Sequence, residues 1–180
     1  MEAGSGEPSA PHNQIGLSDR FAITRLGQDH DRSGFSCGVP PLDRYLKEQA
    51  GQDVRRRLAN CFVAVRDGTS EVGGFYTLSA TAINASWVPE GLRRRFPAYP
   101  VLPATLIGRL AVDQRFRGQR LGESLLIDAI ARASTSDPAS FAVVVDAKDD
   151  AAAGFYLRYD FRPISNEPRA FFLPITYFKK

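Results

Sequence analysis

The sequence predicts an α/β (α+β) domain of three layers, in which helices flank a mixed and partly parallel central sheet. Two apolar runs, residues 104–112 and 141–145, have the length and the continuous apolar character of strands buried in the middle of a sheet. Directly after the first run, Leu121, Leu125 and Ala129 recur at helical spacing and give one apolar face. Strands and helices mixed in this way are typical of a layered α/β domain.

The length and the composition fit one folded domain. At 180 residues, with 43% hydrophobic and 24% charged residues, the chain is long enough to bury a sizeable core. Residues 1–16 are rich in Gly, Ser and Pro, hold Glu2 and Glu7 without Lys or Arg, and have no apolar segment. This predicts a disordered tail rather than a signal peptide, followed by a domain at residues 17–180. The whole chain has a net charge of +3, and the two glutamates give the tail a charge of −2. The domain without the tail therefore carries +5, which favours polyanionic partners.

The usage of cysteine and histidine excludes several kinds of site. Cys37 and Cys61 stand far apart and outside any C-x-x-C motif, so we expect two buried thiols and neither a zinc site nor a disulfide framework. His12 lies in the tail, and His30 alone offers too few ligands for a metal and no convincing base for a Ser-His-Asp or Cys-His hydrolase. No apolar run reaches membrane-spanning length, so we expect a cytoplasmic protein without membrane contact.

Two elements open the domain. Residues 21–23 predict a short first strand, and residues 35–38 predict a loop. Pro40 and Pro41 suit the start of a helix that runs to about Val54. The predicted apolar face of this helix consists of Leu42, Tyr45, Leu46, Gln49 and Ala50.

A hairpin and a loop come before the central strand. Residues 61–65 and 72–79 are rich in β-forming residues, and Asp67 with Gly68 between them is a strong hairpin signal. Four prolines interrupt residues 87–103 and predict a loop without a regular element. The central strand is therefore expected to begin after this loop.

The C-terminal part predicts one helix and two short strands after the buried strand at residues 141–145. Residues 149–160 predict the helix, whose start is marked by Asp149 and Asp150. Residues 161–164 and 171–175 are β-like, and we expect the last one to be an antiparallel partner in the sheet.

The turn between the central strand and the helix that follows it predicts an anion site. Gly118 and Gly122 allow a positive φ or a close approach of the backbone, and the first helical turn has N–H groups without an intrahelical partner. Such a turn suits a pyrophosphate, although glycines at strand-to-helix turns also serve plain packing. A P-loop would need Lys where Glu123 stands, and the turn lacks the G-x-G-x-x-G of dinucleotide-binding folds.

Residues 117–122 resemble the acetyl-CoA signature Q/R-x-x-G-x-G/A of the GNAT superfamily of N-acetyltransferases. One position departs, because Arg120 stands where the signature has its first Gly. A guanidinium there could reach a phosphate in a charge-assisted contact. The resemblance implies acetyl-CoA as cosubstrate, with contacts from Leu110, Ala111, Val112, Arg117, Gly118, Gln119, Arg120, Leu121, Gly122, Asp149, Ala152 and Phe155.

Residues 149–161 strengthen the resemblance, because they are similar to the late GNAT motif N-x-x-A-x-x-F-Y-x-x-x-G-F. Asp149 replaces the Asn and Asp160 the Gly. A tyrosine at the position of Tyr156 commonly acts in this superfamily as the general acid that protonates the departing CoA thiolate. A phenol with a pKa near 10 is protonated at neutral pH, which suits this role; a packed aromatic at a helix end is the alternative.

A narrower resemblance covers residues 17–173 and concerns the GNAT toxins of bacterial toxin-antitoxin pairs. It is carried by the order of F-S-C-G at 35–38, Y-T-L-S at 76–79, G-R-L-A-V-D at 108–113 and F-Y at 155–156. It implies acetylation of the α-amine of aminoacyl-tRNA, inhibition of translation, a ribbon-helix-helix antitoxin as partner and a homodimer. The alternatives are a GNAT enzyme for a small amine, an antibiotic or a protein N-terminus, and a binding module without catalysis.

Two arginine triplets have two readings each. Arg55, Arg56 and Arg57 follow the first helix, and Arg93, Arg94 and Arg95 lie in the proline-rich loop. A solvated surface is the plain reading, and contact with tRNA phosphates is the functional one. We expect the second triplet to lie near the cofactor end of the sheet, because it comes shortly before the central strand.

Overall fold

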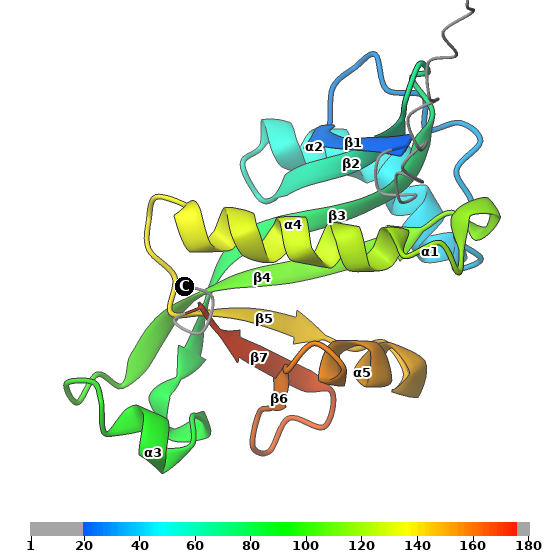
Figure 1. Cartoon of the computed structure of the whole chain (residues 1–180). Coiled ribbons are helices and arrows are strands. Elements are labelled where there is room, and N and C mark those ends of the chain that lie inside the picture. Colours follow the sequence, from blue (N-terminus) through cyan, green and yellow to red (C-terminus); the bar gives the residue numbers. More distant parts are fainter. Residues whose placement is uncertain (1–19, 176–180) are drawn as a thin grey trace, which may run out of the picture.

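The computed structural model describes residues 20–175 and contains one seven-stranded sheet in the order β1-β2-β3-β4-β5-β7-β6 (Figure 1). Neighbouring strands are antiparallel except β4 and β5, which are parallel, so the predicted mixed sheet is confirmed. The predicted tail at residues 1–16, with His12, lies outside the described residues. The strands are β1 (Phe21–Arg25), β2 (Asn60–Arg66), β3 (Val72–Asn84), β4 (Val101–Val112), β5 (Ala142–Asp146), β6 (Arg162–Pro163) and β7 (Ala170–Pro174). The helical segments are α1 (Pro40–Arg44), η2 (Tyr45–Gln49), α2 (Ala50–Arg55), η3 (Ala85–Trp87), α3 (Glu90–Arg93), η4 (Gln114–Phe116), α4 (Leu121–Thr135) and α5 (Asp150–Leu157).

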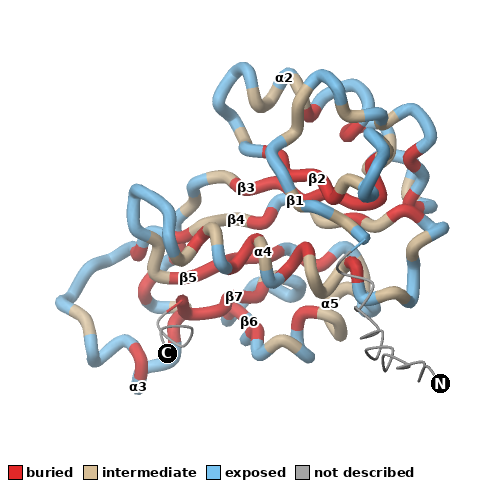
Figure 2. The backbone as a smooth tube through the Cα atoms, turned by 45° about the horizontal axis from the view of Figure 1, so that its top comes forward, coloured by how far each residue is buried: buried red, intermediate tan, exposed pale blue. Residues whose placement is uncertain are grey.

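Helices cover both faces of the sheet. On the face that we call the α4 face, Tyr76 of β3, Ile107 of β4 and Val143 of β5 share one hydrophobic cluster with α4 and α5. On the opposite face, which we call the α1 face, Phe75 and Ala111 share a cluster with η2 and α2. A separate cluster near α3 also lies on the α1 face. It contains Ala142 and Val144 of β5, which alternate along the strand with Val143 on the α4 face. Figure 2 shows many of the buried residues along the strands of the sheet.

The first helical region runs from Pro40 to Arg55, close to its predicted bounds, but it contains a π-helical turn at η2. Tyr45, Leu46 and Ala50 are buried, as predicted. Gln49 is exposed, so its predicted place on the apolar face is wrong. A π turn holds one more residue than an α turn, and this shifts the phase of the face after Leu46.

The hairpin between β2 and β3 forms as predicted, and Gly68 adopts a φ of +74° at its turn. The loop predicted at residues 87–103 is wrong in part, because α3 lies inside it and β4 already begins at Val101. Pro103 pairs with Ala82 inside the β3–β4 ladder. The carbonyl of Pro103 accepts from the N–H of Phe141, so the carbonyl and the nitrogen of Pro103 both point away from β3. The missing N–H of Pro103 therefore costs no hydrogen bond between β3 and β4.

Cys37 and Cys61 are buried free thiols, as predicted, and burial raises the pKa of Cys61 to about 12. Within residues 20–175, no helix is both long and apolar enough to cross a membrane. In the same part of the chain, no three His, Cys, Asp or Glu side chains gather in a way that could hold a metal ion.

Candidate active site

The turn between β4 and α4 has the backbone of an anion site. Gly118 has a φ of +72°, and Arg120 is the N-cap of α4 with a φ of +63°. Arg120 thus adopts the left-handed conformation that favours glycine, the residue which the signature has there. Its guanidinium binds Glu123 through Nε at 2.6 Å and Nη2 at 2.8 Å, and its side chain is 80% exposed. The side chain of Arg120 therefore turns back onto the first turn of α4.

The loop at residues 35–38 is hydrogen-bonded to the residues that lead into this turn. The guanidinium of Arg117 donates to the carbonyl of Cys37, and the N–H of Gln114 donates to the carbonyl of Ser36 at 2.9 Å. Gly38 has a φ of +81°, and a Cβ on it would lie 2.2 Å from Nε2 of Gln114. The loop that the sequence singled out therefore fixes the residues before α4.

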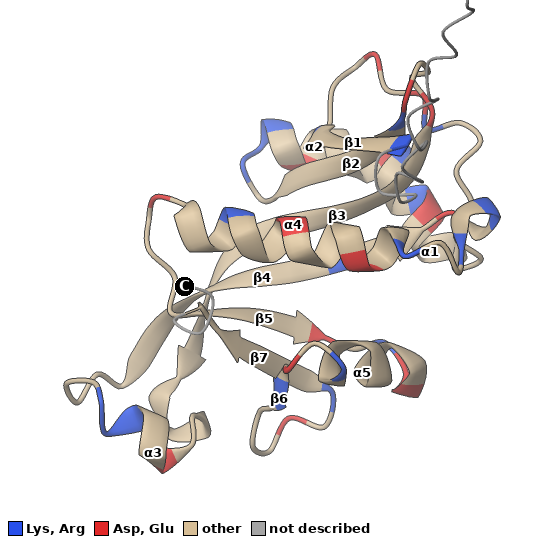
Figure 3. Ribbon diagram, viewed as in Figure 1, with Lys and Arg blue, Asp and Glu red and all other residues tan. Residues whose placement is uncertain are grey.

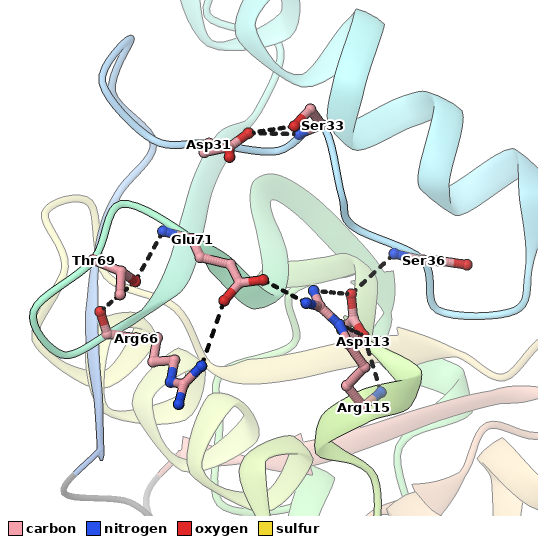
Figure 4. Close-up of polar contacts among 8 residues, drawn as sticks. All are labelled: Asp31, Ser33, Ser36, Arg66, Thr69, Glu71, Asp113 and Arg115. Carbon is pink, nitrogen blue, oxygen red and sulfur yellow. Dashed lines mark hydrogen bonds and ion pairs between the residues drawn. The ribbon is translucent and has the colours of Figure 1, made fainter.

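Asp113 joins these two segments (Figure 4). Its buried carboxylate accepts from the N–H of Ser36 at 3.0 Å and from the N–H and Nε of Arg115 at 2.9 Å each. Burial would raise the pKa of Asp113, but the hydrogen bonds from Arg115 and Ser36 outweigh it and hold the pKa below its usual value. Arg115 also pairs with Glu71 at 2.5 Å, which ties the turn to the start of β3.

The strands β4 and β5 separate in front of this turn. They pair only from Ala104 to Ile107 on β4, so residues 108–112 have β3 alone as a neighbour. The N–H of Asp113 donates to the carbonyl of Gly73, and hydrogen bonds to β3 alternate from there along an antiparallel pair. The peptide groups of Leu110 and Val112 therefore face away from β3 toward the open side.

Ala111 differs from its two neighbours. The same alternation directs its peptide groups to Phe75 of β3, and its side chain lies in the cluster under η2 and α2. Its predicted contact with a cofactor through the backbone is therefore not available, since those groups are already paired.

The helix α5 faces the turn. A Cβ placed on Gly122 would lie 3.6 Å from Cγ2 of Val112 and 4.0 Å from Cζ of Phe155, so these three predicted residues come together. Asp149 is the N-cap of α5 and accepts from the N–H of Ala152 at 2.8 Å. The hydrogen bond from Lys148 and the capping bond hold the pKa of Asp149 below its usual value.

Tyr156 lies on α5 beside Phe155, with 5.3 Å between the ring centroids. Tyr156 is 7% exposed, and burial, together with the charge of Asp146, raises its pKa to about 12. Its hydroxyl makes no hydrogen bond to another residue in the range 20–175, yet every fully buried side-chain oxygen or nitrogen in that range has a partner. The hydroxyl of Tyr156 is therefore not sealed inside the protein.

The other two buried tyrosines differ in this respect. The hydroxyl of Tyr45 donates to Asp53 at 2.9 Å, and that of Tyr76 donates to Asp128 at 2.5 Å. Among the buried tyrosines of the described chain, Tyr156 alone offers a free hydroxyl.

The arginine triplets lie apart from this site. Arg55, Arg56 and Arg57 are exposed at and after the end of α2. Arg93 ends α3, and with Arg94 and Arg95 it precedes the first residue of β4, whereas the turn at residues 117–122 follows its last. The expectation that the second triplet lies near the turn is therefore wrong, and Figure 3 shows these basic residues at the opposite end of the molecule from the start of α4.

Two charged residues were missed. Arg109 lies on β4 where β4 and β5 part, and Asp146 ends β5 near Tyr156. A glycine directly before a charged residue in an apolar strand indicates a bulge, and this signal at Gly108 could have drawn attention to Arg109. No sequence signal pointed to Asp146.

Comparisons with known proteins agree with this geometry. Residues 103–179 match the model of the acetyltransferase (GNAT) domain. The chain is 37% identical over 154 residues to a tRNA-acetylating toxin of Mycobacterium tuberculosis, covering 84% of this chain and 90% of that protein. It is 31% identical over 156 residues to a probable toxin TacT of Sinorhizobium fredii, covering 82% and 86%.

Solved structures show the same fold. AtaT complexed with acetyl-methionyl-tRNAfMet superposes with a TM-score of 0.81 at 26% identity, over 88% of this chain and 97% of that one. AtaTR bound with acetyl-CoA gives a TM-score of 0.75 at 26% identity, over 89% and 97%. A tyrosine-to-phenylalanine mutant of AtaT bound to the C-terminus of the antitoxin AtaR gives 0.74 at 25% identity, over 89% and 97%.

Proposed function

The chain belongs to the GNAT acetyltransferases and is related to their tRNA-acetylating toxins, and from this premise we propose that it transfers acetyl from acetyl-CoA to the α-amine of an aminoacyl-tRNA and thereby inhibits translation. The observation that carries the proposal is the 37% identity to a tRNA-acetylating toxin along 90% of that protein's length. Related structures hold acetyl-CoA and an acetylated, charged tRNA.

The residues around the turn fit acetyl-CoA. Gly118 and Arg120, both with a positive φ, lead into the 15-residue helix α4. The unpaired N–H groups at the start of this helix suit the pyrophosphate. The free peptide groups of Leu110 and Val112 would hydrogen-bond the pantetheine arm, and Phe155 would line its path. Acetyl-CoA supplies the acetyl group in activated form, as a thioester.

Tyr156 is the general acid in this proposal. Its neutral phenol has a hydroxyl that no protein group occupies, so it can donate a proton to the leaving thiolate, whose pKa is near 8.5. The N–H of Val112 faces the open side of β4 and can polarise the thioester carbonyl, an effect often worth several kcal/mol.

No side chain is needed as a strong base. The α-amine of an aminoacyl ester has a lower pKa than an ordinary terminal amine near 8, so a large fraction is neutral at physiological pH. The neutral amine attacks, and its proton is lost to water.

The two arginine triplets would contact tRNA phosphates at separate places. Only Arg94 of the second triplet has an ion pair in the described chain, with Glu90 at 2.6 Å, which leaves Arg93 and Arg95 available. Phosphate contacts hold the tRNA without reading its sequence and make binding strongly dependent on salt.

A ribbon-helix-helix antitoxin and a homodimer complete the proposal. Both rest on the resemblance to toxin-antitoxin pairs, and binding of an antitoxin C-terminus by the related AtaT supports the first. Exposed Tyr99, just before β4, and Val101, its first residue, are available for contact with another chain.

The test is transfer of labelled acetyl from acetyl-CoA to a mixed pool of charged tRNA, with the same pool deacylated as control. The proposal predicts label on the charged pool alone. Label on neither pool, while acetyl-CoA binds, would direct the assignment to a small amine or a protein N-terminus instead.

A further inference from the structure

A β-bulge at Gly108 changes the phase of the central strand. Leu78 of β3 pairs with Ile107 and Thr77 pairs with Arg109, so Gly108 has no partner across the ladder. In a regular strand, residues 107 and 109 would share one face. Ile107 lies in the cluster on the α4 face, whereas Arg109 reaches Tyr45 on the α1 face. The bulge therefore places the guanidinium of Arg109 on the α1 face. Bulges beside active sites often redirect one side chain in this way.

The guanidinium of Arg109 is held but not neutralised. Its Cζ lies 3.6 Å from the centroid of the Tyr45 ring, and the hydroxyl of Tyr45 donates to Asp53 at 2.9 Å. Arg109 is half-buried, and no ion pair among residues 20–175 includes it. A half-buried cation without a carboxylate partner is costly unless an anion reaches it during function.

Arg109 also stands where an acceptor can approach. The pairing of β4 with β5 ends at Ile107, so Gly108 and Arg109 begin the open segment of β4. The α4 face of that segment is occupied by α4 and α5, with Tyr156 among them. On the α1 face, the cluster under η2 and α2 and the cluster near α3 are separate, and Gly108 is exposed. The acceptor amine can therefore approach the open segment from the α1 face.

We propose that Arg109 binds the phosphate of the terminal, aminoacylated nucleotide and thereby presents its α-amine to the thioester. The inference rests on the proposed function and adds a substrate-binding residue to it. A guanidinium matches a phosphate in two parallel hydrogen bonds, and the ring of Tyr45 fixes its plane. The phosphate is joined to the same ribose as the amino acid, so binding it limits where the amine can lie.

The experiment compares two small acceptors that differ only in this phosphate, aminoacyl-adenosine and the aminoacyl ester of adenosine 5′-monophosphate. In the wild-type chain, kcat/KM is expected to be about tenfold to a hundredfold higher for the phosphate-bearing ester. In Arg109→Gln the ratio falls to near one, because kcat/KM drops for that ester alone. Arg44→Gln removes an exposed charge from α1 and retains the wild-type ratio.

A second variant guards against a folding defect. Arg109→Lys keeps the charge without the paired hydrogen bonds, so we expect an intermediate ratio and a melting temperature near that of the wild type. Equal losses on both esters would overturn the inference in favour of a packing role for Arg109. A raised KM for acetyl-CoA would assign the residue to the cofactor.

The two proposals fail in different ways. A wild-type chain that acetylates neither charged tRNA nor either ester overturns the proposed function and the role of Arg109 with it, whereas transfer to charged tRNA and to neither ester overturns the role of Arg109 alone. Transfer to both esters with a wild-type ratio of one, or with an unchanged ratio in Arg109→Gln, overturns the role of Arg109 alone.

Discussion

At the scale of single residues, the proposed chemistry depends on one hydroxyl. Tyr45, Tyr76 and Tyr156 are all buried, but only the hydroxyl of Tyr156 has no protein partner in the described chain. The sequence identified Tyr156 through a motif, and the geometry gives an independent reason for the same choice. The phenol is neutral at physiological pH and its hydroxyl is left unbonded, so its proton is available to a leaving group.

We predict that Tyr156→Phe leaves the Kd for acetyl-CoA nearly unchanged and lowers kcat by about 10²- to 10⁴-fold, because only the proton donor is lost. Calorimetry and steady-state rates measure the two quantities. Tyr159→Phe is the matched control, since Tyr159 also packs on Phe155. An unchanged kcat in Tyr156→Phe would remove the residue from the mechanism.

The pH dependence of kcat offers a second prediction for the same residue. Because its pKa is raised to about 12, Tyr156 stays protonated from pH 7 to 10, so kcat should show no falling limb in that range. Single-turnover rates corrected for ester hydrolysis measure this. A fall in kcat between pH 7 and 10 that is absent in Tyr156→Phe would mean that the acid has an ordinary or lowered pKa.

At the scale of elements, the site depends on how three segments are joined. Asp113 connects the end of β4 to the loop at residues 35–38 and, through Arg115, to β3. The positive-φ turn before α4 is thereby held by the buried carboxylate of Asp113 as well as by the hydrogen bond from Arg117 to Cys37.

We predict that Asp113→Asn lowers the free energy of unfolding by about 1–2 kcal/mol, because neutral hydrogen bonds replace the charge-assisted ones to the buried carboxylate, while the half-exposed Arg115 keeps Glu71 as its partner. The difference between wild type and variant should be full above pH 4. It should disappear as the pH falls through the lowered pKa of Asp113, because protonation then removes the same charge. Urea titrations at pH 7 and at a pH below the lowered pKa of Asp113 measure this, and equal differences at both would contradict it.

The elements themselves could largely be predicted from the sequence, because the continuous apolar runs at residues 104–112 and 141–145 and the helical apolar spacing of residues 121–133 reflect burial directly. The predictions failed where local rules compete with pairing. Pro103 was taken as a strand breaker, yet its missing donor faces away from β3. Gln49 was placed by α-helical spacing, which the π turn interrupts.

The site could be predicted only where a motif covers it. Motifs led to residues 117–122 and Tyr156 as candidates, whereas Arg109 was missed because its orientation depends on a bulge that no periodicity reveals. Ala111 was predicted together with Leu110 and Val112, although alternation along β4 directs its backbone groups to β3.

At the scale of the whole molecule, the basic residues are spread over the surface rather than gathered at the site. The 12 residues of β4 span roughly 35–40 Å and separate Arg93–Arg95 from the turn at residues 117–122. A small amine could not use both places, whereas a tRNA is large enough to do so.

We predict that changing Arg93, Arg94 and Arg95 together to Ala weakens tRNA binding at low salt. The plot of log K against log salt should become less steep by about two to three. Each phosphate contact that is lost means that binding releases fewer counterions. The KM for acetyl-CoA should stay the same. Fluorescence titration at several salt concentrations measures the slope, and an unaltered affinity at low salt would make the triplet an ordinary solvated surface.

The most direct test of the account is the identity of the acetylated product. Charged tRNA is treated with the wild-type chain and acetyl-CoA, digested with nuclease, and analysed by mass spectrometry. The account predicts adenosine that carries an amino acid acetylated on its α-amine. Acetyl found on a side-chain amine or on a nucleobase, with the α-amine unmodified, would contradict it.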